Sequence, residues 1–408
     1  MLARLSLVAA LVALASAAPT DSSSTTTAAS TAPTAAPLLP LPDFSGTFAN
    51  EYPTQDVVAP TDTPLVKQWL SELNLTDVAS LPLVPFTSGG DPQNPKAIPA
   101  DACDWTETNC INKDLTVCPL GVWGLTYDDG PTTFSSQLYD FLDKTEQKAT
   151  LFYIGSNVIE NWQSARRACA AGHHIAVHTW SHNPSTSLTN EQFVAEIKYT
   201  ELAIKELCGF TPKYFRPPYG DIDNRIRGLL WAMGYTSVIW DYDTDDWELP
   251  PGGGPMTPEG VDQEFKTWIS NAHNDTTGHI TLQHELYQNT VDAAIRNLPQ
   301  VQATWKAMPV SACMNDATPY RETNITLATM DGTATTRVIT DSSTTTTSND
   351  TLHGSTPSGA SSTGTNAAST GGKAGSSSGS ITMPAGFLNP LAVLATAAAF
   401  AFGGQMLF

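Results

Sequence analysis

Two short segments carry residue types that bind divalent metals. They contain an acidic pair, Asp128 and Asp129, and two histidines four residues apart, His178 and His182. Two imidazoles and one carboxylate suit a divalent cation that keeps an open position for water. Zinc is the expected ion, and cobalt, manganese or iron can replace it. Because an Asp-Gly turn or a histidine pair is common without a metal, the prediction requires that the two segments meet in the fold.

The two acidic residues can have separate roles. If Asp129 binds the metal, its neighbour Asp128 can act as a general base toward a water held in the open position. The alternative is that Asp128 only orients a histidine ligand.

Three further polar groups have both a catalytic and a structural interpretation. Arg216 begins a stiff loop with two prolines and can hold a carboxylate bidentately, which would orient Asp128; such a loop can also be a plain turn. Asp246 and Trp247 place an acid beside an aromatic wall that suits a sugar ring, or form an acidic surface loop. His284 can protonate a leaving amine, or be a buried structural histidine.

Short apolar runs predict the strands that position these groups. Asp128 directly follows the first run, and His178 and His284 end two others. In parallel α/β folds, the loops at the carboxyl ends of the strands converge on one face, so we expect these side chains to meet. The predicted strands cover residues 122–127, 150–154, 174–178, 236–240 and 279–284.

Helical patterns lie between several of these runs. The clearest predicts a helix over 190–208, with a capping box formed by Thr189 and Gln192 and a C-terminal cap at Gly209. A second helix is expected through 138–142. Alternating strands and helices indicate a parallel α/β fold, either open or closed into a barrel.

Five motifs, in this order, resemble those of the carbohydrate esterase family 4 deacetylases, which share the NodB homology domain. The resemblance spans roughly 117–310, about half of the chain. It implies a distorted (β/α) barrel that hydrolyses N- or O-acetyl groups of polysaccharides. The matching segments are Thr126–Pro131, His178–His182, Arg216–Gly220, Asp246–Trp247 and Leu282–Glu285.

The resemblance also implies a role for each motif residue. Asp129, His178 and His182 would bind the metal, Asp128 would be the base and His284 the acid. The residues that would assist them are Arg216, which orients Asp128; Asp246, which tunes His284; Tyr219, whose backbone N–H meets the oxyanion; and Trp247 and Leu282, which shape the acetyl pocket.

The form of the second motif resembles that of fungal chitin deacetylases, so chitin is the expected substrate and chitosan and acetate the expected products. Acetylxylan or another O-acetylated polysaccharide is the alternative. A catalytically silent glycan-binding wall protein is a further alternative, of a different class. A metalloprotease is disfavoured because the chain has no HExxH motif.

Both ends of the chain resemble targeting signals. Residues 1–18 have the basic start, apolar run and small-residue site of a secretory signal peptide, and the apolar run is too short for a plain membrane anchor. Residues 381–408 have the apolar end of a GPI-anchor signal, which is favoured over a transmembrane helix. These signals predict a secreted eukaryotic protein on the outer face of the plasma membrane, in the cell wall, or both.

The remaining sequence divides into three predicted regions. Residues 19–115 form a low-complexity segment and an irregular extension that packs on the barrel, residues 116–312 form the deacetylase domain, and residues 313–380 form a Ser/Thr/Gly-rich stalk. Six cysteines allow up to three disulfides with about 15 possible pairings. Acceptor sequences for N-glycosylation agree with secretion; they lie at Asn74, Asn274, Asn324 and Asn349.

The formal net charge of −20 disfavours nucleic acid and anionic lipid as partners, because phosphate binding needs a basic face. It is compatible with a neutral or cationic polysaccharide, and equally with an acidic surface that keeps an extracellular protein soluble. We expect a monomer.

Overall fold

The computed structural model describes residues 39–87, 92–93 and 98–338. The predicted signal peptide (1–18), GPI signal (381–408) and Asn349 lie outside the described residues. Within the described ranges, no helix is both long enough and apolar enough to cross a membrane.

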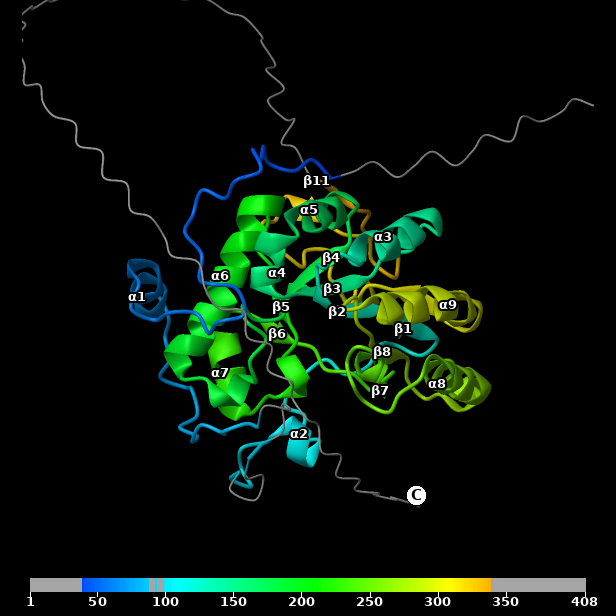
Figure 1. Ribbon diagram of the computed structural model, residues 1–408, viewed down its shortest axis with the longest axis horizontal. Helices are drawn as coiled ribbons and strands as arrows, with labels where there is room; N and C mark the ends of the chain where they lie inside the picture. Colours follow the sequence, from blue (N-terminus) through cyan, green and yellow to red (C-terminus); the bar gives the residue numbers. More distant parts are fainter. Residues whose placement is uncertain (1–38, 88–91, 94–97, 339–408) are drawn as a thin grey trace, which may run out of the picture. The chain divides into compact units, whose positions relative to one another are not determined.

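The core contains two parallel sheets surrounded by helices (Figure 1). The first has the order β2-β3-β4-β5-β6 and the second the order β7-β8-β1-β9. A parallel bridge between Asp128 and His284 joins β2, an edge strand of the first sheet, to the residues that follow β8, an inner strand of the second. This arrangement confirms the predicted parallel α/β class. The bounds are β1 Val122–Gly124, β2 Thr126–Gly130, β3 Thr150–Tyr153, β4 His174–Val177, β5 Tyr214–Phe215, β6 Thr236–Ser237, β7 Tyr242–Asp243, β8 His279–Leu282 and β9 Lys306–Met308.

The first predicted strand, 122–127, is in fact two strands. The chain leaves the second sheet after β1, and at Leu125 it crosses into the first sheet as β2. Every residue of both strands is buried, so the burial pattern does not mark the crossing. The two-residue strands β5 and β7 were not predicted, because they are too short to show a periodicity.

The longest helix begins and ends as predicted. In α6 (Asn190–Cys208), the Thr189 hydroxyl accepts the Gln192 N–H and the Gln192 side chain accepts the Thr189 N–H. Gly209 ends the helix in the left-handed conformation, at φ 85°. The second predicted helix is α3. The bounds of α3 and of the remaining α-helices are α1 Pro64–Ser71, α2 Trp105–Thr108, α3 Ser135–Lys144, α4 Gly155–Glu160, α5 Trp162–Ala170, α7 Asn224–Ala232, α8 Pro258–Asn271, α9 Gln288–Thr304 and α10 Val310–Cys313.

Segments on both sides of the predicted 116–312 domain pack against it. Leu39 and Val66 lie in the same buried apolar cluster as Phe193 of α6. In Figure 1 the blue N-terminal segment runs past α6 and α7. After residue 312, Tyr320 is buried, and β10 (Ile325–Thr326) pairs antiparallel with β11 (Arg337–Val338). Packed structure therefore extends into the region predicted as a stalk from residue 313.

Three disulfides pair all six cysteines: Cys103–Cys110, Cys118–Cys313 and Cys169–Cys208. Cys118–Cys313 joins residues 195 positions apart and connects the start of the barrel to α10.

Candidate metal centre and catalytic site

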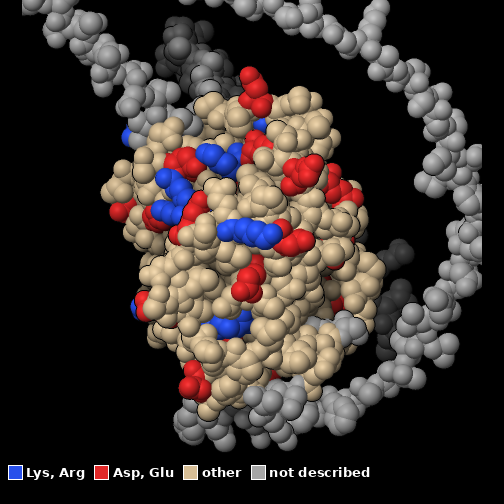
Figure 2. Space-filling model, turned by 90° about the vertical axis from the view of Figure 1, so that its left-hand side faces the viewer, with Lys and Arg blue, Asp and Glu red and all other residues tan. Residues whose placement is uncertain are grey.

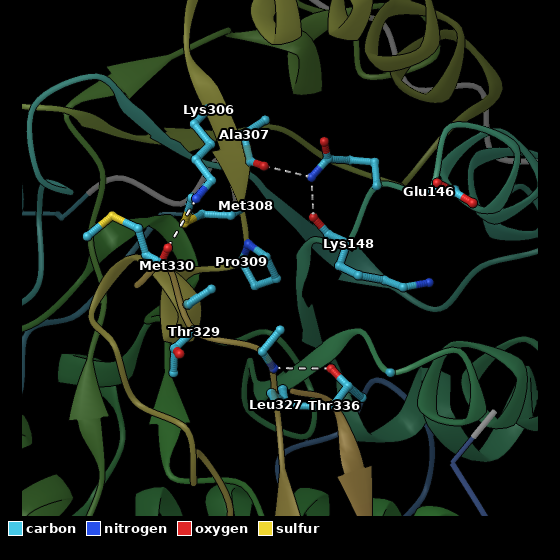
Figure 3. A pocket seen from close by; sticks show the side chains of 14 residues that line it. Glu146, Lys148, Lys306, Ala307, Met308, Pro309, Leu327, Thr329, Met330 and Thr336 are labelled. Carbon is cyan, nitrogen blue, oxygen red and sulfur yellow. Dashed lines mark hydrogen bonds between the residues drawn. The ribbon is translucent and has the colours of Figure 1, made fainter. Parts of the chain in front are cut away.

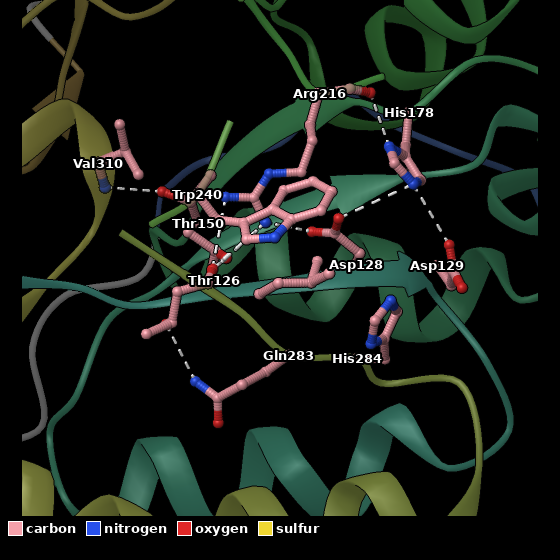
Figure 4. Close-up of polar contacts among 12 residues, drawn as sticks. Thr126, Asp128, Asp129, Thr150, His178, Arg216, Trp240, Gln283, His284 and Val310 are labelled. Carbon is pink, nitrogen blue, oxygen red and sulfur yellow. Dashed lines mark hydrogen bonds and ion pairs between the residues drawn. The ribbon is translucent and has the colours of Figure 1, made fainter. Parts of the chain in front are cut away.

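A bulge at the end of β2 brings both acidic side chains to one region. In the pairing of β2 with β3, Asp128 faces Phe152 and Gly130 faces Tyr153, so Asp129 is the extra residue, with φ 67°. Neighbouring side chains normally point to opposite faces of a strand, and a bulge removes this alternation. Accordingly, Asp128 Oδ2 and Asp129 Oδ1 lie 3.8 and 3.4 Å from His178 Nε2 (Figure 4).

Asp129, His178 and His182 have the geometry of a metal site. Asp129 Oδ1 lies 3.4 Å from His178 Nε2 and 3.2 Å from His182 Nε2, and the three candidate ligand atoms lie within 4.8 Å of one another. Bonds of about 2.0–2.2 Å in tetrahedral geometry separate neighbouring ligand atoms by about 3.3 Å. Asp129 Oδ1 is buried and accepts no hydrogen bond from the described residues. These three residues therefore fit a divalent cation.

The orientation of His178 is set by a backbone carbonyl. His178 Nδ1 lies 2.7 Å from the Arg216 carbonyl oxygen. Since a carbonyl only accepts, Nδ1 carries the proton and the lone pair of Nε2 faces Asp129, as in metal-ligating histidines.

Asp129 is held in its ionised form. Burial alone would raise the pKa of its carboxyl, but the nearby imidazoles, His182 above all, outweigh burial and lower it well below 3.8. An ionised carboxylate beside two imidazoles also provides the negative charge and lone pairs that bind a cation.

Arg216 fixes Asp128 through a buried hydrogen bond. It follows β5 and is fully buried, and its Nη1 donates to Asp128 Oδ1 at 2.9 Å and to Thr126 Oγ1 at 2.7 Å. Its guanidinium carbon stands 4.3 Å from the centroid of the Phe152 ring. The contact uses one N–H, so the bidentate pairing considered for Arg216 is wrong. Asp128 Oδ2 faces the histidines instead (Figure 4).

Asp246 and His284 form a buried, hydrogen-bonded pair. Asp246 begins the short helix η4 (Asp246–Glu248), and its Oδ1 lies 2.6 Å from His284 Nδ1 while Oδ2 accepts the His284 backbone N–H at 3.0 Å. Burial lowers the pKa of His284, but the carboxylates of Asp246, Asp129 and Asp128 together raise it from 6.5 to about 10. His284 is therefore an imidazolium at neutral pH.

The three predicted pocket residues occupy different positions. The Tyr219 ring is about half exposed and its centroid lies 4.8 Å from that of His182, which places it at the rim of the site. Trp247 directly follows Asp246 and is also about half exposed, whereas Leu282 is buried at the end of β8. Their roles in binding an acetyl group remain predictions.

Two buried glutamates near the site had no predicted role. Glu196 on α6 accepts the backbone N–H groups of Trp180 and Ser181, between the two candidate histidine ligands. Glu285 fills the space beside Gly130, where an added Cβ would lie 1.9 Å from Glu285 Oε1. The sequence did contain a signal for Glu196. It is a charged residue next to Ile197, on the apolar face of the predicted helix.

A cavity of about 230 Å³ lies elsewhere (Figure 3). Lys148 and Gly172, which precede β3 and β4, contribute to its wall, so it lies near the amino ends of these strands. Asp128, Asp129 and His178 do not line it. The candidate chemistry is therefore confined to the carboxyl ends of the strands.

Comparisons with known proteins agree with this geometry. The sequence profile of the family described as polysaccharide deacetylase matches residues 119–238. Chitin deacetylase 1 of Cryptococcus neoformans var. grubii is 38% identical over 338 residues, which cover 78% of this chain and 71% of that protein. The chain therefore belongs to the polysaccharide deacetylase family.

Two other relatives extend the comparison. A chitin deacetylase of Amylomyces rouxii is 44% identical over 232 residues, and the match spans 54% of each protein. The solved structure of the chitin deacetylase from the fungal pathogen Colletotrichum lindemuthianum aligns with a TM-score of 0.47 at 29% identity, covering 51% of this chain and 95% of that one.

Proposed function

We propose that this protein hydrolyses the N-acetyl groups of N-acetylglucosamine residues in chitin, releasing acetate and leaving chitosan. The observation that carries the proposal is the convergence of a candidate base, a candidate acid and a three-residue metal group from separate segments. Asp128 and His284 are paired across the bridge between the sheets, with Asp129, His178 and His182 beside them. The similarity to proteins named chitin deacetylases supports the choice of substrate.

Asp129, His178 and His182 would hold the divalent metal, for which zinc is our first choice and Co²⁺ or Mn²⁺ the alternatives. When bound, such an ion makes water more acidic and polarises a carbonyl group. The buried carboxylate and the Nε2 lone pair of His178 are already oriented for this purpose.

The chain's own residues supply the proton transfers. Asp128 Oδ2 faces the candidate ligands and would accept a proton from the attacking water, while Arg216 holds Oδ1. His284 is protonated at neutral pH and would give its Nε2 proton to the leaving amine nitrogen, because Nδ1 is held by Asp246. The backbone N–H of Tyr219 would donate to the acetyl oxygen as negative charge develops there. The balance is one amide and one water giving acetate and an amine.

We also propose that the protein acts outside the cell, anchored by a GPI lipid or retained in the wall. The three disulfides and the exposed acceptor sites Asn74, Asn274 and Asn324 suit a secreted glycoprotein. Figure 2 shows one face of the molecule, on which acidic and basic side chains are interspersed. A neutral polysaccharide fits such a surface better than a polyanion does, and we propose a monomer with no nucleic-acid partner.

Metal analysis of the purified protein, combined with acetate release from chitin oligomers and from acetylated xylan, tests the proposal. We expect about one divalent ion per chain and faster release from the chitin oligomers. Faster release from acetylated xylan would favour an O-acetyl esterase. Binding of chitin without metal and without acetate release would favour a glycan-binding wall protein.

A further inference from the structure

The segment that carries both candidate histidine ligands has a strained backbone. Thr179 and His182 are in the left-handed region, at φ 63° and 56°. Residues other than glycine adopt this conformation at a cost, and it persists where the surrounding structure holds it. The Thr179 hydroxyl accepts the His182 N–H at 3.0 Å, but this bond lies within the segment and does not tie it to the rest of the fold.

Glu196 of α6 holds this segment from one side. Its side chain is fully buried, and Oε2 accepts the N–H groups of Trp180 and Ser181, both at 2.8 Å. Oε1 accepts the Ser181 hydroxyl at 2.9 Å. One carboxylate therefore satisfies three donors of Trp180 and Ser181, which are two of the three residues between the ligands.

The first N–H groups of α4 bind the carbonyl groups of the same ligand segment. Gly155 N–H donates to the Thr179 carbonyl at 2.9 Å, and Ser156 N–H donates to the Trp180 carbonyl at 3.1 Å. A Cβ at position 155 would lie 2.6 Å from the Trp180 ring and 2.4 Å from Thr200 Oγ1, so this close approach requires glycine. The ligand segment is thus held by Glu196 at its N–H groups and by α4 at its carbonyl groups.

An N-terminal segment, Tyr52–Ala59, packs against Glu196 and Trp180. The Ala59 N–H donates to Glu196 Oε1 at 2.8 Å, and Trp180 Nε1 donates to the Thr54 carbonyl at 3.1 Å. The Tyr52 ring stacks on Trp180 with centroids 5.7 Å apart and planes 6° apart. Glu196 therefore connects the ligand segment to a part of the chain that precedes the matched family region.

We propose that Glu196 is a positioning residue for the metal site. It acts by fixing the N–H groups between His178 and His182, so that both imidazoles face Asp129 before an ion arrives. The proposal rests on the proposed function of the three ligands as a metal site. It adds a residue that lies in none of the five motifs and that contacts the backbone between the ligands.

Substitutions at Glu196 separate positioning from simple burial. Glu196→Ala removes every acceptor. Glu196→Gln keeps one oxygen, which can still accept the N–H groups of Trp180 and Ser181, while its amide nitrogen faces Ala59. The glutamine should therefore rescue the ligand segment although it disturbs the N-terminal contact.

The chain offers a matched control on the same helix. Glu201 is also buried and accepts the Tyr235 hydroxyl at 2.8 Å. Among the described residues, its hydrogen-bond and ion-pair partners are Lys198, Tyr235 and Arg321, none of which belongs to the ligand segment. Glu201→Ala should lower the stability of α6 without changing the metal site. His178→Ala, which removes a ligand, serves as the control for the site itself.

The test measures Zn²⁺ affinity by competition with a chelator and the visible absorption of the Co²⁺ form, on full-length folded protein. We expect Glu196→Ala to bind Zn²⁺ about 10–100-fold more weakly, the range seen for residues that support metal ligands. Glu196→Gln and Glu201→Ala should remain close to wild type, with an unchanged Co²⁺ spectrum.

Wild-type affinity in Glu196→Ala, or an equal loss in Glu201→Ala, would overturn the inference. If Glu196→Ala does not fold, Glu196→Asp replaces it, because the shorter side chain withdraws the carboxylate from the segment; wild-type affinity in that variant would overturn the inference too. Failure of the wild type to bind Zn²⁺, or undiminished binding by His178→Ala, would instead overturn the proposed metal site.

Discussion

Replacing Asp246 with asparagine tests whether His284 is the general acid. Asp246 Oδ1 lies 2.6 Å from His284 Nδ1, and the asparagine oxygen can still accept that N–H, so the ring keeps this contact and loses the adjacent charge. The amide nitrogen then takes the place of Oδ2, which accepts the His284 backbone N–H. Two unit charges about 4 Å apart interact by about 4 kcal/mol at an effective dielectric constant of about 20. At about 1.4 kcal/mol per pKa unit this equals about three units, the upper end of the roughly 1–3 units that a neighbouring opposite charge produces.

The pH dependence of kcat/KM for acetate release provides the assay. His284 acts in its protonated form, so activity falls as the pH rises through its pKa, which is about 10 in the structure. In Asp246→Asn this alkaline limb should move to lower pH by about 1–3 units. A cation beside Asp129 would lower the His284 pKa in wild type and variant alike, so both are compared with the metal site saturated.

Asp245→Asn is the matched control, because Asp245 adjoins Asp246 in the chain and its left-handed backbone, at φ 50°, tolerates asparagine. Its alkaline limb should stay where it is in the wild type. An unchanged limb in Asp246→Asn, or an equal shift in Asp245→Asn, would refute the role of the Asp246–His284 pair.

Three further predictions concern the base, the fit around the site and the pH dependence of stability. Asp128→Asn should keep the Asp129–His178–His182 set and bind metal, yet lose about 10²–10⁴-fold in turnover. His178→Ala should lose the metal. Metal analysis and acetate release check both variants, and wild-type turnover in both would contradict the assignment. Gly130→Ala should lower the free energy of unfolding by about 1–3 kcal/mol, because its Cβ meets Glu285; an unchanged urea midpoint would show that Glu285 moves freely. Burial lowers the pKa of His279, but Asp241 and Asp275 outweigh it and raise the pKa above 6.5, so its stabilising contribution is complete below pH 6.5 and is lost as the pH rises through the raised value. The urea midpoint should therefore fall less from pH 6.5 to alkaline pH in His279→Gln than in the wild type.

The placement of the candidate site was predictable because parallel strands end at a common face. The sequence shows the polar residues at or directly after the ends of apolar runs. The structure places Asp128 within β2, His178 directly after β4 and His284 two residues after β8. The bounds of α6 were predictable for a local reason: its first and last turns carry their own capping residues, which act within a few positions of the helix.

Features that depend on contacts between distant segments were not predictable. The bulge at Asp129 exists because β2 pairs with β3 on one side and meets His284 on the other, and no local pattern encodes this. The division of the first apolar run at Leu125 likewise depends on which sheet each half joins. Sequence periodicity reports burial, and both halves are equally buried.

Backbone strain at the candidate site explains why the ligands were predictable and their support was not. Asp129, Thr179 and His182 all adopt left-handed backbone conformations, so the candidate ligands are held in positions that their own sequence disfavours. The residues that stabilise such conformations can come from anywhere in the fold, as Glu196 does from α6 and Ala59 from the N-terminal segment. A motif search finds the ligands and misses this support. A chain with all five motifs intact but an apolar residue at the position of Glu196 should therefore bind metal weakly, even though its motifs predict full activity.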